Sequence, residues 1–368
     1  MKPTARWCMT LVKTNMKKED LRIVFMGTPE FAVETLQALV ENDYNVVAVV
    51  TQPDKPVGRH GSVLQPSQVK QYAVAHSLPV LQPEKMKDPA FIEQLRSYNA
   101  NLQVVVAFRM LPEVVWAMPE YGTFNVHAAL LPQYRGAAPI NWAVINGETQ
   151  TGVTTFFLDH DIDTGRIILK KPFAIPDDAD VEYVYDGLMH LGAQLCLETL
   201  EAIIAANGHP ASVAQDNIAA DDSGFTQTVR ESLLSSAALK KAPKIFKETC
   251  EIDWMKPVKQ VYDFIRGLSP VPGAWTTLVA PDGKETVLKI YKSRKTDKAG
   301  QGSGTISTDG KALYISAADA LLEIVELQLA GKKRMLARDF LNGMKGIETY
   351  HVKKKMHCDI INGQPVAF

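Results

Sequence analysis

The stretch "LRIVFMGTPEFAVETLQALVENDYNVVAVVT", residues 21–51, decides the fold of the first half of the chain. Its two ends, residues 21–27 and 45–51, are short apolar runs of the kind that form buried strands. Between them, residues 29–41 carry apolar side chains at helical spacing and begin with Pro29, which favours the first turn of a helix. The stretch therefore predicts a β-α-β unit.

The same alternation continues further along the chain. Apolar runs at 102–108, 122–126 and 152–158 predict strands, and residues 67–76, 88–98, 138–146 and 183–205 predict helices. This pattern predicts an α/β fold with a Rossmann-like, doubly wound and mostly parallel sheet. Ligands of such sheets bind at the carboxyl ends of the strands, so the loops there are the first place to look for a site.

Length and composition limit the class of protein. The chain has 368 residues, 46% of them hydrophobic, which suits about two domains at roughly 100–200 residues each. Its cysteines, Cys8, Cys196, Cys250 and Cys358, show neither the CxxC spacing of a zinc site nor a disulfide framework. No continuous apolar run approaches about 18 residues, and the basic segment before Leu21 makes a poor signal peptide. We expect a cytoplasmic protein with no bound metal and no membrane partner.

Charge is divided unevenly between the two halves of the chain. Residues 225–368 contain 23 Lys and Arg against 15 Asp and Glu, a net charge of +8, whereas residues 1–224 carry a net charge of −9. Basic clusters stand at 292–298, 331–335 and 353–355. They would suit a polyanion such as a nucleic acid. A lysine-rich surface without any partner explains the charge equally well.

Three common ligand-binding motifs are not matched by the sequence. "GTPEFA" at 27–32 keeps only the first glycine of GxGxxG, and the sequence has no GxxxxGK[ST], so nucleotide-dependent dehydrogenases and triphosphatases are disfavoured. "LDHDIDTG" at 158–165 resembles a calcium loop, but Thr164 and Lys170 stand where glycine and glutamate are required.

The reactive residues are expected in "NVHAALLPQYRGAAPIN", residues 125–141. Asn125 and His127 lie two apart, so an extended chain presents both on one face. The strand predicted at 152–158 brings Asp163 near them if it joins the same sheet. An amide, an imidazole and a carboxylate without a serine or cysteine nucleophile suit acyl transfer to an amine. Taken singly, each residue is more often structural, as a buried histidine or a turn residue.

These motifs occur together with "MGTPEFA" and "QPDKPVGR" upstream and with "APKIFKETCEIDW", "IRGLSPVPGAW" and "LQLAGKKRM" downstream. In this order they resemble the 10-formyltetrahydrofolate-dependent formyltransferase family from about Leu21 to the mid-340s. The resemblance implies that Asn125, His127 and Asp163 are catalytic. It also implies that the formyl group of 10-formyltetrahydrofolate is transferred to the α-amine of initiator methionyl-tRNA.

The resemblance also implies where the folate lies, along Ala129, Leu130, Leu131 and Pro132. Many relatives have serine at the position of Ala129, so a hydroxyl contact is absent here. Arg109 stands where relatives often have glycine. It is either a partner of the donor's anionic tail or an exposed surface arginine.

Two regions are implied to bind tRNA. The loop at 52–68 is rich in proline and glycine and carries Arg59, which the resemblance places at the acceptor end of the tRNA; the alternative is a loop with no partner. The second region is a small barrel, predicted from strand-like runs at 286–291, 304–308 and 311–316 and identified by the resemblance as OB-like, which carries Lys332 and Lys333.

The predicted organisation divides the chain into five segments: an extension at 1–20 that is disordered or a mis-called start, a catalytic domain at 21–205, a linker at 206–224, an OB-like domain at 225–350 and a tail at 351–368. We expect a monomer. Two other functions stay open. One is a formyltransferase that acts on glycinamide ribonucleotide or an amino sugar, and the other is a non-enzymatic RNA-binding protein.

The loop at 52–68 generates a first prediction. Arg59→Ala should raise the KM for charged tRNA much more than the dissociation constant for the folate, because the loop would contact only the tRNA. An arginine without a partner would change stability by no more than about 0.5 kcal/mol and leave both substrates unaffected. Steady-state kinetics and folate titration on the purified variant measure the two effects, and equal losses for both substrates would show that the loop shapes the donor pocket instead.

Overall fold

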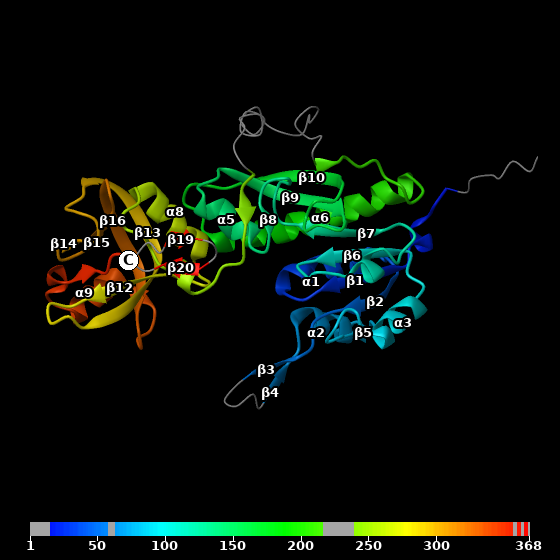
Figure 1. Ribbon diagram of the computed structural model, residues 1–368, viewed down its shortest axis with the longest axis horizontal. Coiled ribbons are helices and arrows are strands. Elements are labelled where there is room, and N and C mark those ends of the chain that lie inside the picture. The colour runs from blue at the N-terminus through cyan, green and yellow to red at the C-terminus, as the bar shows by residue number, and fades with distance from the viewer. Residues whose placement is uncertain (1–14, 58–62, 216–238, 356–358, 362–363, 367–368) are drawn as a thin grey trace, which may run out of the picture.

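The structure, a computed structural model, describes residues 15–57, 63–215, 239–355, 359–361 and 364–366. They form an α/β domain followed by a β-barrel domain that lies beside it (Figure 1). Both parts of the predicted fold are therefore confirmed.

A seven-stranded sheet in the order β10-β9-β7-β6-β1-β2-β5 organises the first domain. Its strands are β1 (Ile23–Gly27), β2 (Val46–Val50), β5 (Val80–Leu81), β6 (Leu102–Val106), β7 (Thr123–His127), β9 (Gln150–Phe157) and β10 (Ile167–Ala174). The neighbouring strands β5, β2, β1, β6 and β7 pair in parallel, whereas β9 runs antiparallel to both β7 and β10. The sheet is thus mostly parallel with an antiparallel edge, which is common in large α/β sheets.

Helices cover both faces of this sheet. They are α1 (Glu30–Glu41), α2 (Gln68–Ala75), α3 (Pro89–Ser97), α4 (Glu113–Trp116), α5 (Pro139–Ile145) and α6 (Val181–Ala205). One hydrophobic core joins α1, α2 and α6 to alternate residues of the central strands, and a second joins α3 and α4 to the other face. Because both faces are covered, every residue of β1 and β6 is buried, and these strands read as continuous apolar runs.

The opening unit forms within a few residues of its predicted bounds. Pro29 occupies the N-cap of α1, and the buried side chains of this helix, among them Phe31 and Leu36, face the sheet. Gly27 ends β1, and a Cβ added there would lie 2.6 Å from the Cβ of Ala32. Glycine at this position therefore permits the close approach of the helix to the strand that precedes it.

The long helix α6 spans 25 residues and by length and composition alone could cross a membrane. Polar residues interrupt its sequence, so the helix contains no continuous apolar run of that length. In the fold its buried side chains, including Leu188 and Leu195, belong to the core that α6 shares with α1 and the sheet. Cys196 lies fully buried in this helix, and burial raises the pKa of its thiol.

The second domain is a nearly closed antiparallel barrel. Its strands are β12 (Ala274–Val279), β13 (Glu285–Ala299), β14 (Ile306–Thr308), β15 (Leu313–Ser316), β16 (Ala320–Leu329), β17 (Met335–Leu336) and β18 (His351–Val352), with helices α8 (Val258–Leu268) and α9 (Ala337–Gly343). The path β14-β15-β16-β13-β12-β18 returns to its start through a bridge between Thr305 and His351. A separate hydrophobic core fills the barrel and includes the apolar faces of α8 and α9.

Parts of the predicted connecting segments pack on the first domain. Val213, within the segment expected as a linker, forms a bridge with Ile167 at the start of β10. Further on, β11 (Lys241–Ala242) pairs with β8 (Arg135–Gly136). At the other end of the chain, the backbone N–H of Met16 donates to the side chain of Asn207 at 2.8 Å. Beyond β18, β19 (Asp359–Ile361) pairs with β20 (Gln364–Val366).

A buried ion pair lies where the two domains meet. Asp263 and Arg266, both on α8 and both more than nine-tenths buried, pair at 2.8 Å. Arg266 also donates to the carbonyl of Ala179, just before α6, at 2.7 Å. Next to them, the side-chain amide of Asn141 on α5 donates to the carbonyl of Gly267 at 2.9 Å. The Arg266 guanidinium thus binds both the Asp263 carboxylate in α8 and a backbone carbonyl of the first domain.

Arg266→Met should lower the free energy of unfolding by about 3 kcal/mol, because it removes the one buried cation that pairs with the buried Asp263 carboxylate among the described residues. Lys259, which lies 2.6 Å from the other oxygen of Asp263, keeps the loss at the low end of the range for a broken buried pair. Arg294→Met removes an exposed pair with Glu323 in the same domain and should cost no more than about 1 kcal/mol. Chemical denaturation of both variants measures the difference, and equal losses would contradict a special role for the buried pair.

Candidate functional site

Asn125 is the middle residue of β7 and His127 is its last residue. Both side chains lie on the face of the sheet that α3 and α4 cover. Phe124 and Val126 alternate with them and point into the core on the α1 and α6 side. His127 is 6% exposed and Asn125 is half-buried. The period of two in an extended chain therefore places both polar side chains together, as the sequence predicted.

Asp163 reaches these residues by a route that the sequence did not suggest. The sequence predicts that a strand in the same sheet brings Asp163 near Asn125 and His127, and β9 does lie in that sheet. Because β9 is antiparallel to β7, however, its last residue, Phe157, pairs with Phe124 near the start of β7. The loop that follows must fold back along β7, and it brings the Asp163 carboxylate to 3.9 Å from the ring of His127. The three residues do converge, but through a returning loop.

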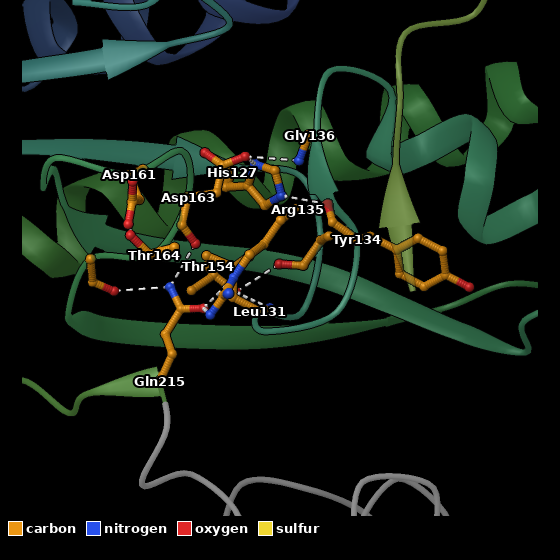
Figure 2. Close-up of polar contacts among 12 residues, drawn as sticks. His127, Leu131, Tyr134, Arg135, Gly136, Thr154, Asp161, Asp163, Thr164 and Gln215 are labelled. Carbon is orange, nitrogen blue, oxygen red and sulfur yellow. Dashed lines mark hydrogen bonds and ion pairs between the residues drawn. The ribbon is translucent and has the colours of Figure 1, made fainter. Parts of the chain in front are cut away.

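Hydrogen bonds hold the carboxylate and the imidazole in place (Figure 2). The backbone N–H of Gly136 donates to Oδ2 of Asp163 at 2.9 Å, and the same oxygen is the one that faces Nδ1 of His127. On the other side of the ring, Nε2 of His127 lies 3.0 Å from the carbonyl oxygen of Tyr134. A carbonyl only accepts hydrogen bonds, so Nε2 carries a proton and the neutral ring keeps its lone pair on Nδ1, toward Asp163.

These side chains line a pocket of about 800 Å³ at the carboxyl ends of β6 and β7, the expected place for a ligand in such a sheet. Its wall includes Phe108, Trp116 and the loop at 158–163. Oδ1 of Asn125 is buried and has no hydrogen-bond partner in the described part of the chain. A buried amide oxygen normally has a partner, so a bound substrate is the natural group to satisfy this side chain.

The segment expected to bind folate lies behind this pocket. None of Ala129, Leu130, Leu131 and Pro132 is among the residues that line it, and Ala129 and Leu131 are fully buried. Their backbone is held by Thr154, whose hydroxyl donates to the carbonyl of Ala129 at 2.6 Å and accepts from the N–H of Leu131 at 3.1 Å. The geometry gives this segment the role of supporting the loop from His127 to Gly136, and direct folate contact rests on the resemblance alone.

Arg109 lines the pocket but is not a free surface arginine. Its guanidinium donates to the backbone carbonyls of Pro83 and Glu84, which ties the loop after β6 to the segment after β5. Its partial burial lowers the pKa of the guanidinium from the ordinary value of arginine. The residue therefore braces the pocket wall.

Several residues of the site were not singled out by sequence reasoning. The hydroxyl of Tyr185, from α6, accepts from the N–H of Phe31 at 2.9 Å, and both residues line the pocket. Lys244 lines it from the chain that leads into the second domain. Phe31 and Lys244 lie in motifs that carried the family resemblance, and this was the available signal. Tyr185 and Gln215, whose amide donates to the carbonyls of Asp163 and Gly165, had no such signal, because they belong to segments expected as a plain helix and a linker.

The residues expected to bind tRNA lie apart from the pocket. The loop at 52–68 contains a short hairpin of β3 (Lys55–Val57) and β4 (Val63–Gln65), and Arg59 falls outside the described residues. Lys332 and Lys333 are exposed in the turn between β16 and β17. Next to them, Arg334 pairs with Glu326 at 2.7 Å. Within the described ranges there is no group of three or more His, Cys, Asp or Glu residues that could hold a metal ion.

Comparison with known proteins identifies two matching family models. The one described as "Formyl transferase" matches residues 21–200, and "Formyl transferase, C-terminal domain" matches residues 244–345. The chain is 59% identical over 340 residues to the methionyl-tRNA formyltransferase of Parabacteroides distasonis, a match that covers 92% of this chain and 100% of that protein. It is 56% identical to the protein of the same name from Bacteroides fragilis, with coverage of 92% and 99%.

Solved structures with the same fold include an N-formyltransferase from Helicobacter canadensis in complex with folinic acid and dTDP-3-aminofucose. Its TM-score is 0.54 at 18% identity, and the match covers 86% of this chain and 100% of that one. HypX from Aquifex aeolicus in complex with tetrahydrofolic acid gives a TM-score of 0.56 at 18% identity, with coverage of 90% of this chain and 48% of HypX. At these identities the likeness establishes the fold alone.

Thr154→Val tests whether the buried hydroxyl supports the loop behind the site. The substitution keeps the shape of the side chain but leaves the carbonyl of Ala129 and the N–H of Leu131 without a partner, which should cost about 1–3 kcal/mol of stability. Thr305→Val, which removes a surface hydroxyl in the second domain, should change stability by less than about 0.5 kcal/mol. Denaturant titration compares the two, and a neutral Thr154→Val would mean that water replaces the hydroxyl.

Proposed function

This chain belongs to the formyl transferase family, and we propose that it transfers the formyl group of 10-formyltetrahydrofolate to the α-amine of initiator methionyl-tRNA. The observation that carries the proposal is the meeting of Asn125, His127 and Asp163 in one pocket. Relatives named methionyl-tRNA formyltransferase match the chain along both domains, which supports this choice of acceptor. A folate donor is supported by neighbours of the same fold that were solved with folates.

In the proposed reaction the neutral α-amine attacks the formyl carbon and a tetrahedral intermediate forms. The amide of Asn125 donates to the oxygen on which negative charge develops, which is the interaction that accelerates acyl transfer most. Oδ1 of the same side chain is buried and has no partner among the described residues, so it would accept a hydrogen bond from an N–H of the bound substrate. The bond from the formyl carbon to N10 of the folate then breaks, and tetrahydrofolate leaves.

His127 moves the proton in this scheme. Since the carbonyl of Tyr134 holds the proton on Nε2, the lone pair on Nδ1 is the site that takes a proton from the attacking amine. The imidazolium so formed is stabilised by the Asp163 carboxylate, 3.9 Å away. Passing the same proton to N10 of the leaving group returns the ring to its starting state. The ring is thus a base toward the amine and an acid toward the folate.

The second domain would hold the body of the tRNA. Support comes from the net charge of +8 on residues 225–368 and from the exposed lysines Lys332 and Lys333. Lys244 would extend this basic surface to the pocket itself. A monomer in the cytoplasm stays our prediction for the working form of the protein.

The decisive experiment supplies 10-formyltetrahydrofolate with one of three acceptors: charged initiator tRNA, glycinamide ribonucleotide or a nucleotide-linked amino sugar. We expect formyl-methionine on the tRNA and no transfer to the other two. Transfer to the sugar or the ribonucleotide alone would replace the proposed acceptor. RNA binding without any transfer would support the non-enzymatic alternative.

His127→Ala and Asn125→Ala should each reduce kcat by about 100–1000-fold, and Asp163→Asn by up to about 10,000-fold, because an amide does not stabilise the imidazolium. Asp161→Asn, a change in an exposed acid that lines the same pocket, is the matched control and should stay within about threefold of the wild type. Single-turnover rates on folded protein measure the chemical step. Near-normal turnover by His127→Ala would remove this mechanism.

A further inference from the structure

We propose that Gln215 is a positioning residue for the reaction, which holds the loop of Asp163 and the loop of Gly136 against each other; the inference rests on the proposed function. Gln215 follows Val213, whose bridge to Ile167 ties this part of the connecting segment to β10. It lies outside the residues matched by either family model. It nevertheless enters the site, directly beneath the Asp163 loop (Figure 2).

Both ends of the Gln215 amide are fully used. Its Nε2 donates to the carbonyl of Asp163 at 2.8 Å and to that of Gly165 at 2.9 Å. Its Oε1 accepts two hydrogen bonds from the guanidinium of Arg135, at 3.0 Å from Nε and 2.5 Å from the terminal nitrogen. The residue is only 5% exposed. A buried amide with four hydrogen bonds to two separate loops acts as a rigid cross-link between them.

The Asp163 loop needs such a constraint. Asp163 has a φ of +56°, in the left-handed region that a non-glycine residue adopts at some cost. Two residues later the backbone passes so close to β9 that a Cβ on Gly165 would lie 1.7 Å from the carbonyl oxygen of Phe157. The two carbonyls on either side of this turn are those that Gln215 binds. Its amide therefore selects the one turn conformation that directs the carboxylate to His127.

The bonds to Arg135 constrain the other partner of the carboxylate. Arg135 precedes Gly136, whose N–H donates to Oδ2 of Asp163. Gln215 thus binds the backbone of the acid directly, and it binds the side chain of the residue that precedes the donating N–H. The returning part of the connecting segment meets the same loop, because the N–H of Tyr134 donates to the carbonyl of Lys240 at 2.7 Å. Without Gln215, the Asp163 loop and the loop of Arg135 and Gly136 would lose this link between them.

Two substitutions remove these bonds in different ways while they preserve side-chain volume. Gln215→Met removes all four hydrogen bonds. Gln215→Glu can still accept from Arg135 but cannot donate to the carbonyls of Asp163 and Gly165, and it places a negative charge beside them. Ser212→Ala is the matched control, because it removes a hydrogen bond of 3.0 Å from Arg166 to the same connecting segment, away from the carboxylate.

Both Gln215 variants should lower kcat by about 10–100-fold, as expected for a displaced catalytic group, with the KM of both substrates within about threefold of the wild type. Ser212→Ala should match the wild type in kcat. Normal kcat in Gln215→Glu would show that the hydrogen bonds to the carbonyls of Asp163 and Gly165 do not position the carboxylate, which contradicts the proposal. Normal kcat in both variants would overturn it for the bonds to Arg135 as well.

A second measurement does not depend on catalysis. His127 faces the Asp163 carboxylate, the carbonyl of Tyr134 and the ring of Phe156. If Gln215 holds the carboxylate near the ring, the NMR signals of the His127 ring protons should move in Gln215→Met and keep their wild-type positions in Ser212→Ala. Unchanged ring signals in Gln215→Met would overturn the positioning role. If the wild type fails to formylate methionyl-tRNA while these signals move as expected, the proposed function fails and the role of Gln215 stands.

Discussion

The hydrogen bond from Gly136 to the Asp163 carboxylate is the interaction on which the site depends. The antiparallel direction of β9 leaves its last residue beside Phe124, so Asp163 must return along β7 before it can meet His127. The N–H of Gly136 fixes the position of the returning carboxylate, because it binds the oxygen that faces the imidazole. Two loops far apart in sequence are thereby joined at the Asp163 carboxylate.

The backbone also decides which nitrogen of His127 is available. Tyr134 has a φ of +61°, and this left-handed conformation belongs to the turn whose carbonyl accepts from Nε2 of His127. The side chain of Tyr134 anchors that turn through its hydroxyl, which lies 2.5 Å from Glu148. Burial, with the hydrogen bond to Glu148, raises the pKa of Tyr134, so the hydroxyl stays protonated and donates. The tautomer of the His127 ring thus follows from the fold of a loop.

Helix α5 connects the candidate site to the interface between the two domains. The loop from His127 leads directly into α5, and α5 packs against α8 of the barrel domain through the bond from Asn141 to Gly267. The buried pair of Asp263 and Arg266 stands at the same junction and reaches the carbonyl of Ala179. Because a buried charge is costly to leave unpaired, the two domains favour one arrangement. In the proposed function, that arrangement would set where a tRNA held by the barrel meets the pocket.

The sequence by itself determined many of the helices and strands of this protein and the shared face of Asn125 and His127. Helix α1 and the strands β1, β2, β6 and β7 form within a few residues of their predicted bounds, because burial of apolar side chains at a period of two or 3.6 is a local property. The same period placed Asn125 beside His127. Only the tertiary structure decided that β9 is antiparallel, that the carbonyl of Tyr134 accepts from Nε2 of His127, and that Gln215 binds the Asp163 loop. All three features are hydrogen bonds to backbone groups. Nearly every residue carries the same backbone groups, so the amino-acid pattern carries no signal for which of them will meet.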